Sequence, residues 1–329
     1  MLILGVDTSC DDTSVAVLRD HEVLSNVVSS QVSIHALFGG VVPEIASRKH
    51  VEVIDRMLGQ ALNEADVTLR DIEILSVTQG PGLIGSLLVG LCFGKGLALS
   101  LGIPLVGVNH IEAHAMSIFL ERKVEFPFVS LIVSGGHTVI LMFSAPTAFR
   151  VLGSTRDDAA GEAFDKIAKY LGLGYPGGKV IEEMARGGNP EYISFPRPMA
   201  DENNYDFSFS GLKTAFINYV KKHDVSDENR SDLLASFQEA ACDVLSTKTA
   251  KAAHDAGVKT VVMGGGVASN ERLRRAVTER CAEKGISVSV PSPGYCTDNG
   301  AMVAMAASFY AERELFSPID VKAFSRMRW

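Results

Sequence analysis

The chain has 329 residues, of which 47% are hydrophobic and 21% are charged, and its formal net charge is −8. This composition is that of an ordinary globular protein with one large core or two medium ones. The acidic balance excludes a surface that is basic overall and binds nucleic acid throughout, although a local basic patch or a basic partner is compatible with it. Five cysteines without a C-x-x-C pair argue against a disulfide framework and a structural zinc site, and they fit a reducing cytosol.

The first third of the chain alternates strand-like and helix-like patterns, which is typical of α/β folds. Strands are predicted at 2–6, 14–18, 72–77 and 105–108, and helices at 45–65 and 83–99. The longest apolar stretch, 83–104, is interrupted by Lys95 and several glycines. We interpret it as a buried helix rather than a membrane span, so no membrane partner is expected.

The second part of the chain opens like the first. Strands predicted at 129–133 and 139–143 flank the polar turn 134–138, just as the first two strands flank the polar turn 7–13. This similarity predicts an internal duplication, and the alternative is a chance occurrence of two hairpins. Helices are predicted further on at 158–171, 211–222 and 231–256, a strand at 258–263, a glycine-rich turn at 264–270 and a helix at 301–310.

Two histidines, His110 and His114, follow the apolar run 103–108 and stand four residues apart. On a helix, residues at this spacing share one face, with Cβ atoms about 5–6 Å apart. Two imidazole nitrogens placed in this way can bind one metal ion. The alternative is two unrelated histidines near the start of a helix, so a third ligand is needed to support a metal site.

Asp298 is the candidate third ligand. It lies where a loop ends and an apolar helix begins, which is also a common position for an N-cap aspartate. Thr297 or Asn299 can cap the helix instead and leave Asp298 free. Two histidines and one carboxylate with open positions form the ligand set that non-haem ferrous iron prefers, and zinc also accepts it.

Three small-residue turns, at 7–13, 134–138 and 264–270, follow predicted strands. Consecutive backbone N–H groups in such turns form concave anion sites, and a following helix adds its dipole. Together they predict a nucleotide held between two lobes, while each turn alone could be structural. We expect the last turn to contact the adenosine, and a Cβ at Gly265 to weaken nucleotide binding in a protein that stays folded.

Long motifs spread from about residue 2 to about residue 310 match one family in the same order. They lie at 7–13, 39–48, 80–83, 109–114, 133–138, 157–166, 175–178, 207–213, 264–270 and 296–300. On these motifs the chain resembles the bacterial tRNA threonylcarbamoyladenosine synthase (TsaD) family, formerly called the O-sialoglycoprotein endopeptidase family.

The resemblance implies the two-lobed actin/Hsp70/sugar-kinase fold, an α/β fold with a duplicated core and a cleft between the lobes. The first lobe would comprise 1–112 and a C-terminal helix at 300–329, and the second lobe 113–299 with a helical insertion at about 155–256. The implied reaction moves a threonylcarbamoyl group from threonylcarbamoyl-AMP to the exocyclic amine of the adenosine adjacent to the anticodon. The tRNAs would be those that read codons starting with A, and AMP would be released.

The resemblance also implies the site residues. One divalent metal per subunit, with Fe²⁺ favoured over Zn²⁺, would be held by His110, His114 and Asp298. The adenylate would be bound by Ile132, Val133, Ser134, Gly135, Gly136, Asp165, Gly178, Glu182, Gly265 and Asn270. Glu182 stands where many relatives have Asp, Asp7 and Asp12 stand where relatives often have Glu, and Ile132 replaces the tyrosine of archaeal and eukaryotic relatives.

The implied chemistry needs alignment more than a strong nucleophile, because the mixed anhydride is already activated. Alignment alone contributes roughly 7–11 kcal/mol of barrier lowering in favourable cases. The amides of 134–136 are expected to stabilise the departing phosphate in the manner of an oxyanion hole. Asp12 or Asp165 is the candidate to accept the amine proton, and a hydrogen bond to the adenylate or within the fold is an equal alternative for either.

Two other functions belong to different classes. A metalloendopeptidase of the zincin type has glutamate directly after the first histidine, whereas Ile111 occupies that place here and Glu112 follows it. One residue turns the side chain by about 100° on a helix, which argues against a peptidase. A nucleotide-binding ATPase of the same fold has no need of His110, His114 and Asp298.

The expected partners follow from the resemblance as well. They are tRNA, a TsaB-like paralogue docked on the first lobe and a TsaE-like ATPase, in a cytoplasmic setting. Three basic clusters occur, at Lys221–Lys222, at Arg272 with Arg274 and Arg275, and at Arg326 with Arg328. Each is more simply read as a solvated helix face, so tRNA binding by the isolated chain is expected to be weak and to improve with the partners.

Overall fold

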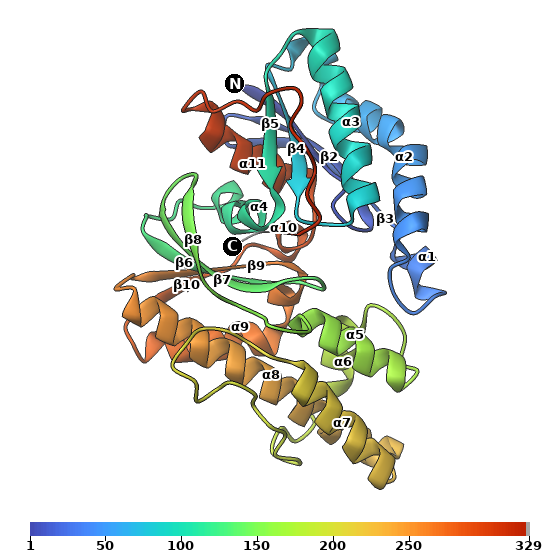
Figure 1. Ribbon diagram of the computed structural model, residues 1–329, viewed down its shortest axis with the longest axis vertical. Coiled ribbons are helices and arrows are strands. Elements are labelled where there is room, and N and C mark those ends of the chain that lie inside the picture. Colours follow the sequence, from blue (N-terminus) through green and yellow to red (C-terminus); the bar gives the residue numbers. More distant parts are fainter. Residues whose placement is uncertain (327–329) are drawn as a thin grey trace. The chain divides into compact units, whose positions relative to one another are not determined.

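The computed structural model describes residues 1–326, which form two compact units (Figure 1). The first unit comprises Met1–Val124 together with the chain from Pro291 onward, and the second comprises Glu125–Val290. The first unit thus extends further than 1–112, because 3-10 helix η2 (Ser117–Leu120) and α10 (Pro293–Cys296) pack with its elements. The predicted C-terminal helix 300–329 is shorter than expected, since α11 spans Gly300–Ala311, and residues 327–329 lie outside the described part of the chain.

The first unit contains a five-stranded sheet in the order β3-β2-β1-β4-β5. Its strands are β1 (Leu2–Asp7), β2 (Asp12–Arg19), β3 (Glu22–Ser30), β4 (Ile74–Gly80) and β5 (Leu105–Asn109). The first three pair antiparallel, and β4 and β5 continue the sheet in parallel with β1. Since β1 is buried at every position, both faces of the sheet are covered, as its unbroken apolar run predicts.

The second unit repeats this topology in the order β10-β9-β6-β7-β8. Its strands are β6 (Phe128–Val133), β7 (Thr138–Ala145), β8 (Ala148–Ser154), β9 (Thr260–Gly264) and β10 (Ser287–Ser289). Again the first three strands pair antiparallel, and the last two are parallel to the first. The predicted internal duplication is therefore confirmed by strand order and direction.

Helices α2 (Pro43–Glu64), α3 (Ile84–Leu101) and α11 pack on the first sheet, and short helices α1 (Val32–Ala36) and α4 (His110–Met116) complete the unit. One helix of the described chain, α3, is long and apolar enough by length and composition to cross a membrane. A core helix passes the same test, and α3 packs against β4 and α2. Its glycines permit this packing, because a Cβ at Gly94 would lie 2.3 Å from Val77 Cγ2.

The second unit carries α5 (Ala160–Tyr170), α6 (Gly177–Ala185), α7 (Ser210–Lys222), α8 (Asp227–Asp255) and α9 (Glu271–Ala282), with 3-10 helix η3 (Gly266–Ser269). Helices α8 and α9 lie side by side, and α6 packs on α5 and α8 (Figure 1). The stretch from α5 to α8 runs from Ala160 to Asp255. Strands β3, β8 and β10 were not predicted, since they have partly exposed or short sequences.

Candidate metal centre and nucleotide cradle

The three predicted metal ligands are brought together in the first unit. The rings of His110 and His114 lie edge to face with centroids 4.6 Å apart. Asp298 Oδ1 lies 3.6 Å from His110 Nε2 and 3.1 Å from His114 Nε2. Each of the three residues offers one ligand atom, and these three atoms lie within 4.8 Å of one another. A single ion can therefore contact all three side chains.

Two helix caps place these ligands. The Asn109 side chain accepts hydrogen bonds from Ile111 N and Glu112 N, so α4 begins at His110 and both histidines share one of its faces. Asn299 Oδ1 accepts from Met302 N at the start of α11. Asn299 is thus the cap, and Asp298 is free of that task, as one of the two sequence interpretations proposed.

Close packing of α11 on β1 fixes where Asp298 lies. A Cβ at Gly5 would lie 2.2 Å from Gly300 O, so only glycine allows this approach. Gly300 N also donates to Ser14 Oγ at 2.8 Å. The end of the loop that carries Asp298 is therefore held against two strands of the first sheet.

Burial of these polar side chains destabilises the metal-free protein. His114 is fully buried; its Nε2 lies 3.1 Å from Asp298 Oδ1, and its Nδ1 has no hydrogen-bond partner among the described residues. Burial by itself raises the pKa of Asp298, but the adjacent imidazoles of His110 and His114 hold it below its usual range. Buried nitrogens without partners are costly, whereas metal coordination satisfies them. These residues therefore fit the metal that the donor set favours.

Asp7 and Ser9 contact two of the three ligands, His110 and Asp298. Ser9 Oγ donates to Asp7 Oδ2 at 3.1 Å and lies 3.4 Å from Asp298 Oδ2. Asp7 Oδ1 lies 3.9 Å from His110 Nδ1. Burial and then the charge of Asp298 raise the pKa of Asp7 well above its usual range. Sequence reasoning noted Asp7 only as a variant position, although an aspartate ending a buried strand is a signal for a site.

Asp12, a predicted catalytic residue, begins β2 in the same unit. Its Oδ1 is buried and has no hydrogen-bond partner within residues 1–326. Burial, followed by the charge of Asp298, raises the pKa of Asp12 to about 7. A carboxylate with this pKa can accept a proton near neutral pH.

The predicted adenylate-binding residues all lie in the second unit, where contacts connect them in sequence. A Cβ at Gly161, in the first turn of α5, would lie 2.5 Å from Ser134 O, so this turn packs against the 134–138 turn. Asp165 Oδ1 accepts from Gly177 N at 2.7 Å, which ties α5 to the start of α6. Glu182 Oε1 accepts from Glu271 N at 2.7 Å, which ties α6 to the start of α9.

These contacts assemble a cradle, defined here as the 134–138 turn, the starts of α5 and α6 and the 264–270 turn. Gly135 and Gly136 are exposed, and a Cβ at Gly135, Gly136 or Gly178 would meet nothing within 4 Å. Ile132 and Val133 are fully buried, so they line the floor of the cradle from within β6 rather than its open surface. Asn270 caps α9 through Leu273 N and donates to Gln238 Oε1 at 2.8 Å, so its amide also supports the fold.

The comparison with known proteins identifies the family. The family model "TsaD: tRNA N6-adenosine threonylcarbamoyltransferase" matches residues 22–305. The chain belongs to this family. It is 52% identical over 326 residues to the tRNA N6-adenosine threonylcarbamoyltransferase of Geotalea uraniireducens (strain Rf4). The aligned region covers 98% of this chain and 95% of the relative.

Solved structures support the fold alone. HypF of T. kodakarensis superposes with a TM-score of 0.65 at 14% identity, over 95% of this chain and 48% of that one. The activator of the 2-hydroxyisocaproyl-CoA dehydratase from Clostridium difficile, with bound ADPNP, gives a TM-score of 0.54 at 14% identity, over 95% and 96%. The duplicated topology and these neighbours show the actin/Hsp70/sugar-kinase fold that the family resemblance implied.

In this structure Glu112 is not placed to act as the general base of a metallopeptidase. Glu112 is buried, and its Oε2 accepts the Tyr310 hydroxyl at 2.8 Å. Burial raises the pKa of Glu112 to about 7. This carboxyl group therefore joins α4 to α11 in the core, and sequence reasoning did not foresee its partner.

Gly265 requires a correction. Its φ is +88°, and a Cβ there would lie 2.3 Å from Val133 O. The expectation that a side chain could be added at Gly265 without disturbing the fold is wrong, because the backbone of β6 occupies that space. Nucleotide binding has to be tested instead at the glycines of the cradle that face open space.

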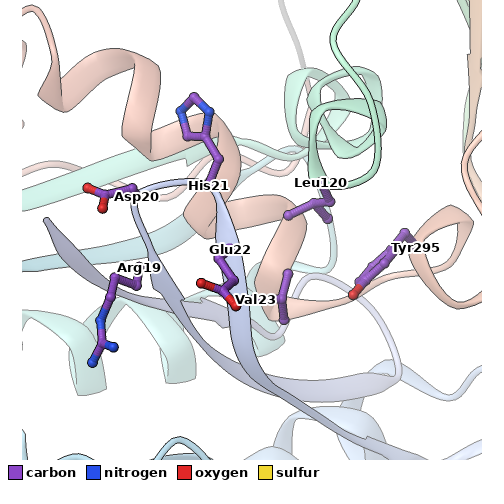
Figure 2. A pocket seen from close by; sticks show the side chains of 7 residues that line it. All are labelled: Arg19, Asp20, His21, Glu22, Val23, Leu120 and Tyr295. Carbon is purple, nitrogen blue, oxygen red and sulfur yellow. The ribbon is translucent and has the colours of Figure 1, made fainter.

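Two cavities in the described part of the first unit are lined by residues outside these clusters. One of about 590 Å³ lies at the β2–β3 turn and is lined by residues 19–23 together with Leu120 and Tyr295 (Figure 2). Another of about 480 Å³ lies at the starts of α2 and α3. Neither is lined by His110, His114, Asp298 or Asp12, and the first mixes acidic and basic groups without a common ligand chemistry.

Proposed function

We propose that this chain transfers the threonylcarbamoyl group of threonylcarbamoyl-AMP to the exocyclic amine of the adenosine adjacent to the anticodon, releasing AMP. The tRNAs are those that read codons starting with A. The observation that carries this proposal is the convergence of two buried histidines, His110 and His114, on the partly exposed Asp298 in a chain of the TsaD family. An ATPase or binding module of the same fold has no use for such a set.

The metal is proposed to be Fe²⁺, with Zn²⁺ as the alternative, at one ion per subunit. Two imidazoles and a carboxylate are the donor set that ferrous iron favours. When bound, the ion supplies Lewis acidity toward a carbonyl oxygen or a clamp for the threonyl group. His110, His114 and Asp298 supply the ligand atoms, and Asp7 and Ser9 orient His110 and Asp298 from behind.

The cradle of the second unit is proposed to bind the adenylate. The N–H groups of 134–136 and the start of α5 offer donors to the phosphate, where negative charge develops as AMP departs. The start of α6, with Gly178, and the 264–270 turn would lie along the nucleoside. Glu182 and Asn270 hold these segments together through Glu271 N and Gln238.

Replacing Gly178 with alanine should weaken adenylate binding without weakening the fold. A Cβ there meets no described atom within 4 Å, and a helical Gly→Ala change stabilises by about 0.4–1 kcal/mol. Gly59→Ala on α2 is the matched control, because its Cβ also meets nothing within 4 Å. Calorimetry with AMP or a stable adenylate analogue should show lower affinity for the Gly178 variant alone, and equal affinities would remove α6 from the cradle.

Asp12 is proposed as the acceptor of the amine proton. The alternative, Asp165, accepts a hydrogen bond from Gly177 N and so helps to build the cradle. Asp12 instead presents a buried oxygen that lacks a hydrogen-bond partner in the described chain, and its pKa of about 7 suits a general base. As the amine attacks the carbonyl, its proton would pass to Asp12 and the C–O bond to phosphate would break.

The TsaB-like paralogue is proposed to dock on the exposed face of α3. Ile84, Leu88 and Leu99 are 48%, 46% and 67% exposed on this helix, and Val51 of α2 is also exposed. Several large apolar side chains on one helix are typical of a protein interface. The TsaE-like ATPase is a second proposed partner, and the tRNA substrate implies a cytoplasmic location.

The basic clusters offer little to tRNA on their own. Arg272 makes two bonds of 2.6 Å to Glu239, and Arg274 donates to Ala268 O. Lys221 and Lys222 lie in the last turn of α7, where their charge complements the helix dipole. In the third cluster Arg326 is described, while Arg328 lies outside the described residues.

Binding of tRNA should therefore be weak for the isolated chain and should tighten when the paralogue is added. Titrations across salt concentrations should show a steeper slope with the partner, by roughly 0.7–0.9 log units per added phosphate contact. Leu88→Glu should abolish the increase in tRNA affinity that the paralogue produces. Leu315→Glu, at another exposed leucine, should preserve this increase. Tight, steeply salt-dependent binding by the isolated chain would contradict the need for partners.

The proposed function is tested in cells by depleting this chain and analysing the nucleosides of total tRNA. Threonylcarbamoyladenosine should fall and return when the wild-type chain is supplied. Supplying His114→Ala should not restore it. Unchanged threonylcarbamoyladenosine after depletion would overturn the proposal.

A further inference from the structure

A buried histidine outside the metal site, His50 on α2, spans the 7–13 turn. Its Nδ1 lies 2.7 Å from Thr13 Oγ1, and its Nε2 lies 3.0 Å from Cys10 O. Because a carbonyl can only accept, Nε2 carries the proton and Nδ1 accepts from the Thr13 hydroxyl. Burial lowers the pKa of His50, which keeps this neutral form. The imidazole is thus fixed in one tautomer by two different residues of the turn.

A second contact holds Asp11, which lies between Cys10 and Thr13 in this turn. Gln31 N donates to Asp11 O at 3.1 Å. The side chain of Gln31 is itself held, since its Nε2 donates to Ala46 O at 3.3 Å and its Oε1 lies 3.2 Å from His35 Nε2. The turn is therefore tied to α1 and α2 at Cys10, Asp11 and Thr13.

Asp12 is the residue that these contacts bracket. Its backbone pairs with Ser30 at the start of β2, and its buried Oδ1 has no hydrogen-bond partner within the described chain. A hydrogen bond with the Ser30 side chain holds the carboxylate on one side, while Oδ1 is left unsatisfied. The orientation of the carboxylate therefore also depends on the backbone on either side of Asp12, which His50 anchors at Cys10 and Thr13.

We propose that His50 is a positioning residue for the transfer reaction, acting through Cys10 and Thr13 to hold the Asp12 carboxylate toward the attacking amine. This inference rests on the proposed function, in which Asp12 accepts the amine proton. His50 itself touches no substrate. Its contribution is geometric, because misplacement of a reacting group by about 1 Å can cost on the order of 10²-fold in rate.

Three variants test whether the hydrogen bond between Thr13 and His50 supports the reaction, and they disturb the fold to different extents. Thr13→Val removes the hydroxyl that donates to His50 and preserves the shape, Thr13→Ser keeps the hydroxyl, and His50→Gln shortens the bridge. With the partners present, Thr13→Val and His50→Gln should lower kcat roughly 10- to 100-fold and leave the KM values for adenylate and tRNA nearly unchanged. Thr13→Ser should recover most of the rate, and His254→Gln, at an exposed histidine, should match the wild type.

The deciding measurement is a double-mutant cycle between His50→Gln and Asp12→Asn. If His50 acts through Asp12, its loss should cost less than about twofold once Asp12 is asparagine, since coupled residues are not additive. The same fold loss in both backgrounds, or a wild-type kcat for Thr13→Val, would overturn the positioning role. Failure of the proposed function is seen separately, as a wild-type protein that transfers nothing, and failure of the Asp12 role as an Asp12→Asn variant with wild-type kcat.

Discussion

His114→Ala is expected to lose its metal and to abolish tRNA modification. The fully buried imidazole supplies one of three ligand atoms, and the remaining two hold an ion far less tightly. The effect has a readout apart from activity. Metal at roughly 100 times its Kd should stabilise the wild type by about 2.7 kcal/mol, whereas the variant should gain almost nothing.

Metal analysis of purified protein and thermal melting with and without Fe²⁺ check this prediction. His110→Ala should behave in the same way, and His223→Ala, at an exposed histidine, should keep both metal and activity. Full metal content and full activity in both the His110 and His114 variants would show that the site is assigned incorrectly.

Asp12→Asn should lower kcat by roughly 10²- to 10⁴-fold, the usual contribution of a general base. The wild-type rate should rise with pH as Asp12 loses its proton, with a limb at or below the pKa of about 7. A bound cation neutralises Asp298 and lowers that pKa, so the limb should move toward lower pH in the metal-loaded protein. The variant should lack the limb.

Stability provides the control for Asp12. Its pKa is raised from 3.8 to about 7 on folding, so the folded state favours the protonated form. The metal-free wild type should therefore lose stability relative to Asp12→Asn as the pH rises through this range. Denaturant titrations at acidic and neutral pH measure the difference. A variant with low activity and a lower stability at neutral pH would instead indicate a structural role.

The sequence predicts much of this architecture because its signals are local. The i, i+4 spacing of His110 and His114 places them on one helix face, and the asparagine after Asp298 provides the cap that frees it. The two polar turns that head matching strand pairs predict the duplicated sheets. The adenylate residues came from family resemblance, and the second unit gathers their segments around one cradle.

Other features depend on distant contacts that no local pattern reveals. His50 lies 37 residues from Thr13, and Glu112 lies 198 residues from its partner Tyr310. Gly265 suggested an open surface for a purine, but its neighbour is the backbone of β6, from another part of the chain. Strand β3 was missed because half-exposed residues weaken its alternation.

The most direct test is a single-turnover reaction with threonylcarbamoyl-AMP labelled in the threonyl group, tRNA, the metal-loaded chain and its partners. We predict that label enters the adenosine adjacent to the anticodon, with one AMP released for each modified tRNA. Release of AMP while the tRNA stays unlabelled would contradict the account, because it would show an enzyme that cleaves the adenylate without transferring its acyl group.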